Sequence, residues 1–131
     1  MVKAFTLVEI LIVIAIAGIL LFLTLPMGIG FYRTQQIDTT TEEVIQALRR
    51  AQSNAMAVDG DQTWTVYFES GQYRLEDETF DTLDDITFGG LTSVTFAKLT
   101  GLPTSTGNIT LTLDSEVKTI SINSVGRINY E

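Results

Sequence analysis

A long apolar run near the start of the chain constrains its fold more than any other feature. Between Ile10 and Leu25 the one polar side chain is Thr24, and between Lys3 and Arg33 the one formal charge is Glu9. With its apolar flanks, the run reaches the roughly 20 residues that a helix needs to cross the hydrocarbon core of a membrane. We therefore expect a long membrane-spanning helix near the N-terminus.

The composition excludes most catalytic and metal-binding schemes. The 131 residues include no cysteine and no histidine, so disulfides, thiolate metal sites, the commonest general base and the commonest zinc ligand are all unavailable. A carboxylate pair or a serine–lysine dyad stays open in principle, but no spacing in the sequence points to either. We expect no enzymatic activity, no catalytic residue, no cofactor and no metal.

The charge balance argues against nucleic-acid binding. The formal net charge is −8, and fifteen acidic but six basic residues follow Arg33. A field of that sign repels phosphate backbones, because polyanion binding needs clustered Lys and Arg side chains that displace counterions. Nucleic acid is therefore an unlikely partner on charge alone.

The residues before the apolar run form a specific motif. A short leader with Lys3 ends at Ala4, Phe5 follows, and Glu9 lies four positions further on in apolar sequence. This arrangement resembles the class III leader of type IV pilins and type II secretion pseudopilins. The resemblance implies cleavage between Ala4 and Phe5 by a prepilin peptidase, followed by N-methylation of Phe5. The residue before the cut is usually glycine in that family.

Glu9 is the one charge inside the apolar run. An ionised carboxylate at the centre of a membrane helix costs about 2.5–3.5 kcal/mol on insertion scales, so such residues usually face a partner or a polar cavity. The resemblance implies that Glu9 meets the Phe5 amine of a neighbouring subunit during filament assembly. The alternative from position alone is that Glu9 lies near the headgroups and snorkels.

Pro26 predicts a helix break near the end of the run. Proline removes one backbone hydrogen bond and clashes with the preceding turn, and Gly28 and Gly30 lower helix propensity further. The pilin family often carries a helix-breaking proline at this place. The alternative is a kink without any role in assembly.

The rest of the chain predicts an amphipathic helix followed by β-structure. Thr40 and Glu43 fit a capping box, apolar residues then recur at three- and four-residue steps, and Gly60 is expected to end the helix. From Gln62 the pattern alternates with period two, and strand-like runs begin at Trp64, Gln72, Ile86, Thr92, Ile109, Val117 and Arg127. The expected fold class is α+β and pilin-like: a membrane-spanning helix that continues into an amphipathic helix packed on an antiparallel β-sheet or sandwich body.

The layout also resembles the GspH/FimT-type minor pilins. Three segments carry this looser similarity: Leu48–Ala55, Gly101–Pro103 and Ile120–Ile128. The expected organisation is a prepilin leader at 1–4, a transmembrane and assembly helix at 5–31, its amphipathic continuation at 32–60, and a β-rich globular domain at 61–131.

Three further features are candidate sites. The acidic segment Glu76–Asp85 could hold calcium, but it lacks the order of an EF-hand loop and fits a solvated loop better. Arg49 and Arg50 could contact a phosphate or a partner, although water or nearby carboxylates are the simpler neighbours. Arg127 could touch DNA, as basic residues near this end do in some FimT-like relatives, but it stands alone in an acidic domain.

The leading hypothesis is a structural subunit, a minor pilin or pseudopilin of a type IV pilus or type II secretion pseudopilus, assembled through its N-terminal helix. The alternatives are a major pilin, a filament-tip module for DNA uptake or adhesion, or a signal-anchored binding domain. The expected partners are the prepilin peptidase, other pilins or pseudopilins and an inner-membrane assembly platform. The expected location is the inner membrane, as a single-pass protein with its globular domain outside the cytoplasm, and the filament after assembly.

Overall fold

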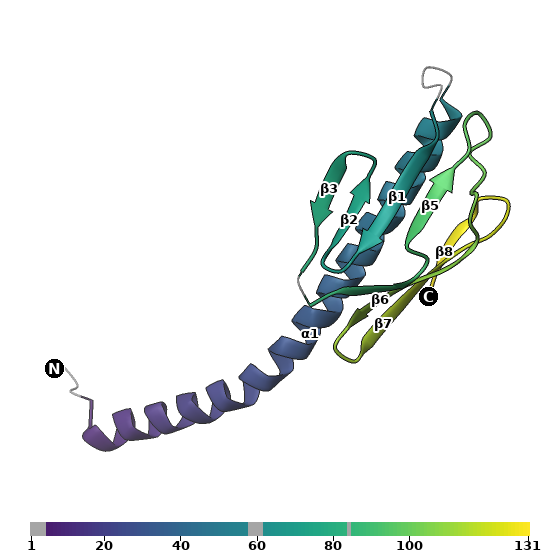
Figure 1. The fold of residues 1–131 in the computed structure, drawn as a ribbon. Helices are drawn as coiled ribbons and strands as arrows, with labels where there is room; N and C mark the ends of the chain where they lie inside the picture. The colour runs from purple at the N-terminus through teal and green to yellow at the C-terminus, as the bar shows by residue number, and fades with distance from the viewer. Residues whose placement is uncertain (1–4, 58–61, 84) are drawn as a thin grey trace. The chain divides into compact units, whose positions relative to one another are not determined.

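The chain forms two compact units that share one helix. The computed structural model describes residues 5–57, 62–83 and 85–131, except for the side chains of residues 23–29. The units are Met1–Thr34 and Gln35–Glu131. Helix α1 (Leu7–Met56) supplies the regular structure of the first unit and the helical layer of the second (Figure 1).

The membrane-spanning helix expected from the sequence is a wrong prediction. In the part of the chain that the structure describes, no helix is both long and apolar enough to cross a membrane. Apart from Phe31 and Tyr32, the described apolar side chains of the first unit's helix occupy one continuous stretch, residues 7–22. At about 1.5 Å per residue this stretch is roughly 24 Å long, which is shorter than the ~30 Å hydrocarbon core. Within the described residues, the observed fold is therefore α1 and a β body, without the expected membrane span.

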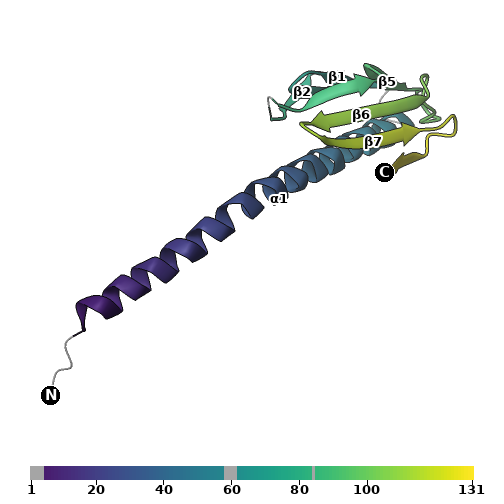
Figure 2. The ribbon, with the colours of Figure 1, turned by 90° about the horizontal axis from the view of Figure 1, so that it is seen from below.

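The second unit contains two antiparallel sheets of four strands each. The first has the order β3-β2-β1-β5 and consists of β1 (Trp64–Glu69), β2 (Gln72–Leu75), β3 (Glu78–Asp81) and β5 (Ser93–Phe96). The second has the order β4-β6-β7-β8 and consists of β4 (Thr87–Gly90), β6 (Gly107–Leu113), β7 (Glu116–Ile122) and β8 (Ile128–Tyr130). Figures 1 and 2 show both sheets beside the second part of α1.

One apolar core joins this part of α1 to both sheets. The register pairs Val66 of β1 with Leu75 of β2 and with Val94 of β5, so these side chains share one face of the first sheet. They are buried together with Phe96 of the same sheet, one stripe of the helix and residues of the second sheet: Ile37, Val44, Leu48, Ala51, Ala55, Ile109, Leu111 and Ile120. The predicted amphipathic helix and its packing on antiparallel strands are confirmed in this unit.

The capping box expected at Thr40 and Glu43 is also a wrong prediction, because α1 passes through both residues without interruption. The neighbouring threonines bond backward along the same helix. The Thr41 hydroxyl donates to the Ile37 carbonyl at 2.6 Å, and the Thr39 hydroxyl donates to the Gln35 carbonyl at 2.9 Å. Whenever the preceding turn is helical, a threonine hydroxyl can donate to the carbonyl four residues earlier instead of capping a helix. The helix end expected at Gly60 lies outside the described residues.

Each predicted strand run contains a strand, but the sequence did not predict β3. The acidic segment that begins at Glu76 was expected to be a loop, yet Glu78–Asp81 pairs with β2. Glu76 has a positive φ of 51° at the turn between the two strands, and its carboxylate accepts a hydrogen bond from the Thr65 amide. Pairing with β2 therefore outweighs the low strand propensity of the acidic residues.

Candidate assembly surface

Helix α1 begins with a cap formed by Thr6. The Thr6 hydroxyl accepts a hydrogen bond from the Glu9 amide at 3.3 Å, and the Thr6 carbonyl accepts from the amides of Glu9 and Ile10. Thr6 is thus the N-cap, and Glu9 lies in the first turn, where a carboxylate interacts favourably with the positive end of the helix dipole. Thr6 is a residue that the sequence reasoning missed, although Thr6-Leu7-Val8-Glu9 has the spacing of a capping box.

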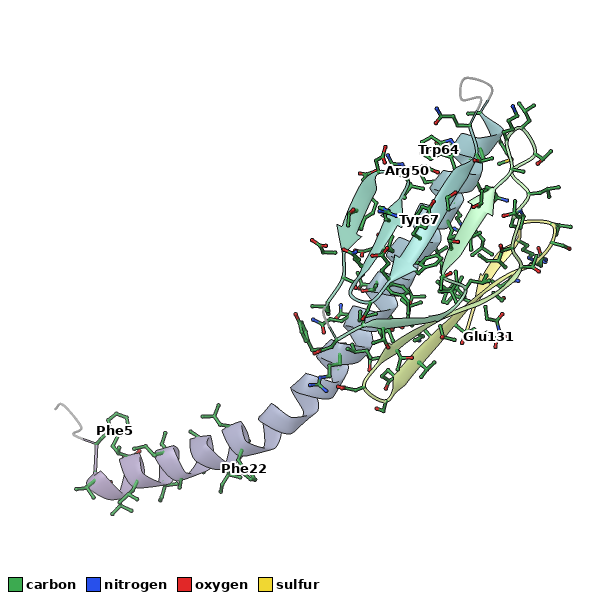
Figure 3. The ribbon with its side chains drawn as sticks, viewed as in Figure 1. Phe5, Phe22, Arg50, Trp64, Tyr67 and Glu131 are labelled. Carbon is green, nitrogen blue, oxygen red and sulfur yellow. The ribbon has the colours of Figure 1, made fainter. Side chains whose placement is uncertain are left out.

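Of the residues expected at the processing and assembly site, Phe5 and Glu9 are described and both are exposed. Phe5 is 73% exposed, and Figure 3 shows its side chain at the start of α1. Ala4 lies outside the described residues, as does the side chain of Pro26, so the cleavage site and the helix break stay predictions.

Apolar side chains cover the whole circumference of this part of α1. The five consecutive residues from Ile10 to Ile14 are each between 48% and 66% exposed, and Phe22 is 79% exposed. Consecutive helical positions point in different directions, so no polar face remains among them. Figure 3 shows these side chains projecting from the ribbon between the labelled Phe5 and Phe22. We define residues 5–22 as the apolar surface.

A surface of this kind in water is unfavourable. Burying one Leu, Ile, Val or Phe side chain contributes about 1.5–3 kcal/mol, and contiguous apolar patches of this extent mark sites of association. Glu9 is the one formal charge within the apolar surface. A partner that covers the surface must therefore offer apolar side chains and, near Glu9, a positive or hydrogen-bonding group.

The other residues weighed from the sequence are placed in the second unit. Arg50 pairs with Glu78 at 3.1 Å, as expected for an arginine with carboxylates nearby. The described acidic residues form no group of three or more side chains placed to hold a metal ion. Arg127 is exposed, and its backbone amide donates to the Asn123 side chain at 2.8 Å.

Tyr73 and Tyr67 of the first sheet each have a ring contact with a residue of a neighbouring strand. Tyr73 stacks on Phe80 with ring centroids 5.0 Å apart, and the Arg74 guanidinium lies 4.7 Å above the Tyr67 ring. Tyr73 is 4% exposed. Its burial, followed by the nearby charges of Glu43 and Glu78, raises its pKa to about 12.

Three comparisons with known proteins give no match for the chain. No family model matches it, and the searches of curated proteins and of solved structures give no match.

Proposed function

We propose that the chain is a filament subunit of the type IV pilin-like class, a minor pilin or pseudopilin, that associates with other subunits through the apolar surface at residues 5–22. The observation that carries the proposal is this surface itself, in which exposed apolar side chains surround the helix and Glu9 is the one charge. The motif of Ala4, Phe5 and Glu9 supports it, because it resembles the leader of that class.

The chemistry of association follows from the two kinds of side chain on the apolar surface. Apolar residues of neighbouring helices remove each other from water, which supplies a non-directional driving force. Glu9 supplies direction, since a carboxylate surrounded by apolar contacts is stabilised only where a cation or donor faces it. After cleavage, the amine of Phe5 in an incoming subunit is the natural cation, and it fixes the axial position of one subunit against the next.

The proposal includes a processing step and a location. Prepilin peptidase cleaves the precursor between Ala4 and Phe5, and the other partners are further pilins or pseudopilins and an inner-membrane assembly platform. The precursor is located at the inner membrane before it enters the filament.

The proposal is tested by intact mass and N-terminal sequencing of the chain from cells with and without an active prepilin peptidase. We expect a mature chain that starts at methylated Phe5 only when the peptidase is active. A Glu9→Ala variant should still be cleaved but be lost from sheared filament fractions, whereas Glu131→Ala, at an exposed position of the β body, should be incorporated normally. An uncleaved chain in the presence of active peptidase would contradict the proposal.

A further inference from the structure

A groove of about 360 Å³ lies between α1 and the β2–β3 hairpin of the second unit. Glu42, Glu43 and Arg50 line it from the helix, and Tyr73, Leu75 and Phe80 line it from the strands. The hairpin lies beside this part of α1 in Figure 1, and Arg50 is labelled at this place in Figure 3. The groove belongs entirely to the second unit and is separate from the apolar surface.

The floor of the groove is aromatic and aliphatic. Tyr73 and Leu75 are 4% and 2% exposed, and the Phe80 ring is half-buried where it stacks on Tyr73 at an interplanar angle of 11°. Such a floor suits the methylene stem of a long side chain, which packs on apolar surface while its charged head stays near polar groups.

The rim of the groove is negatively charged. Glu42 and Glu43 are exposed on α1, and Glu78 lies on the opposite side. The cation on the rim, Arg50, already forms an ion pair with Glu78. The charges of Glu43 and Glu78 both contribute to the raised pKa of Tyr73, so the potential that they create reaches the floor.

Tyr73 also brings a polar group, its hydroxyl, to the lining of the groove. Tyr73 is 4% exposed and no hydrogen bond of its hydroxyl is seen within the described residues, but the hydroxyl is not among the fully buried polar atoms that lack a partner, so solvent reaches it. The hydroxyl is protonated at neutral pH, as an ordinary tyrosine is, because its pKa of about 12 lies far above 7, and its oxygen retains lone pairs that can accept a hydrogen bond. A donor that enters the groove would satisfy it.

We propose that this groove is a docking site for a lysine or arginine side chain of a partner protein. The stem lies on Phe80 and Tyr73, and the cationic head donates to the carboxylates of Glu42 and Glu43 in charge-assisted hydrogen bonds. Charge complementarity excludes nucleic acid, and the net charge of −8 disfavours a second copy of this chain. The proposal goes beyond filament assembly, since it assigns a recognition surface to the β body.

The test uses the full chain in a nonionic detergent and a capped hexapeptide in which glycine and lysine alternate. Amide chemical shifts in NMR spectra are followed during titration, with the glycine–glutamate hexapeptide as the opposite-charge control. We expect saturable shifts confined to Gln46, Tyr73, Phe80 and their neighbours with the lysine peptide, and none with the glutamate peptide. Shifts spread over the whole acidic surface would overturn the proposal.

Matched variants separate a specific groove from general charge attraction. Glu42→Gln/Glu43→Gln removes two exposed carboxylates from the rim. Glu116→Gln/Glu131→Gln removes one carboxylate from β7 and one from the residue after β8, for the same change in net charge. We expect the first variant to weaken peptide binding by about tenfold or more and the second by less than about twofold. Equal weakening in both would overturn the proposal.

The outcome is independent of filament assembly. Glu9→Ala should leave peptide binding unchanged, because Glu9 belongs to the first unit. If the unaltered chain forms filaments but does not bind the peptide, only the proposal for the groove is contradicted. If Glu9→Ala loses filaments but still binds the peptide, the effect concerns filament assembly alone.

Discussion

Two parts of helix α1 differ in the burial of their apolar side chains. Within residues 37–55, Ile37, Val44, Leu48, Ala51 and Ala55 form a stripe that is fully buried against two sheets, and exposed polar residues occupy the opposite side. Within residues 7–22, apolar residues occupy almost every position and stay exposed. Residues 37–55 bury their apolar side chains within the same chain, whereas residues 7–22 need other molecules to bury theirs.

The difference between these two parts of α1 distinguishes the residues that determine stability from those that determine association. The apolar residues of the second unit determine whether the β body folds, and those of the first unit determine whether chains meet. A substitution in one part should therefore leave the property of the other part unchanged, and the predictions below test this separation from the largest expected effect to the smallest.

Removing a buried side chain from the helix stripe should give the largest effect. Leu48 is fully buried, so Leu48→Ala should lower the free energy of unfolding of the β body by about 2–5 kcal/mol. Leu11 is 60% exposed, and Leu11→Ala should change that free energy by less than about 0.5 kcal/mol. Urea denaturation followed by Trp64 fluorescence measures both. A comparable loss from Leu11→Ala would contradict the claim that residues 7–22 do not determine the stability of the β body.

The buried tyrosine should make the β body sensitive to alkaline pH. The pKa of Tyr73 is raised from 10.0 to about 12 in the folded chain. Below pH 10 Tyr73 is protonated in both the folded and the unfolded state, and its contribution to the free energy of unfolding is fully present. As pH rises toward 12 the unfolded state loses its proton first, and this contribution is lost. The expected loss is at most about 1.4 kcal/mol per pH unit across that window.

Tyr73→Phe isolates this contribution. The pKa of Lys118 is also raised, mainly by its hydrogen bond with Asp38, so a second alkaline loss in the same direction remains in the variant. Urea denaturation at pH 9 and pH 11 should show a smaller decline for Tyr73→Phe than for the unaltered chain. An equal decline would mean that Tyr73 ionises as an exposed tyrosine does.

A medium effect is expected where one helix residue holds two loops. The Gln52 amide donates to the carbonyls of Gly101 and Gly126, each at 3.1 Å. Gln52→Ala should lower the free energy of unfolding by about 1–2 kcal/mol, since two half-buried carbonyls lose a donor. Ser53→Ala, at an exposed position on the same helix, is the control and should change little in urea denaturation.

The smallest effect should come from the surface ion pair between α1 and β7. Lys118 and Asp38 lie 2.7 Å apart and are partly exposed. Asp38→Asn should lower the free energy of unfolding by about 0.2–1 kcal/mol, and the difference should shrink in high salt because solvent screens the pair. Thermal unfolding at low and high salt measures it. A salt-independent loss would indicate lost packing instead of lost charge.

Sequence periodicity predicted the second unit well and the first unit poorly. The stripe through Val44 and Leu48 and the alternation through Val66 and Phe68 depend on local spacing, and both are observed as a buried helix face and a buried strand face. β3 escaped prediction because its pairing with β2 is a tertiary effect that outweighs the propensity of acidic residues.

The errors at the threonines have a local cause. The spacing that suits a capping box occurs both at Thr6 and at Thr40, and the spacing alone does not say whether a helical turn precedes the threonine. Where one does, as at Thr41, the hydroxyl bonds backward to Ile37 instead. The groove beside Tyr73 could not be predicted, because its two walls come from segments far apart in the sequence.

The most direct test of the central claim is disulfide cross-linking between single-cysteine variants, which the absence of native cysteine allows. Leu11→Cys places a thiol on the apolar surface, and Leu99→Cys places one at an exposed apolar position of the β body. Under mild oxidation in cells, we expect cross-linked dimers from Leu11→Cys and few from Leu99→Cys. Equal or absent cross-linking at both positions would contradict assembly through the apolar surface.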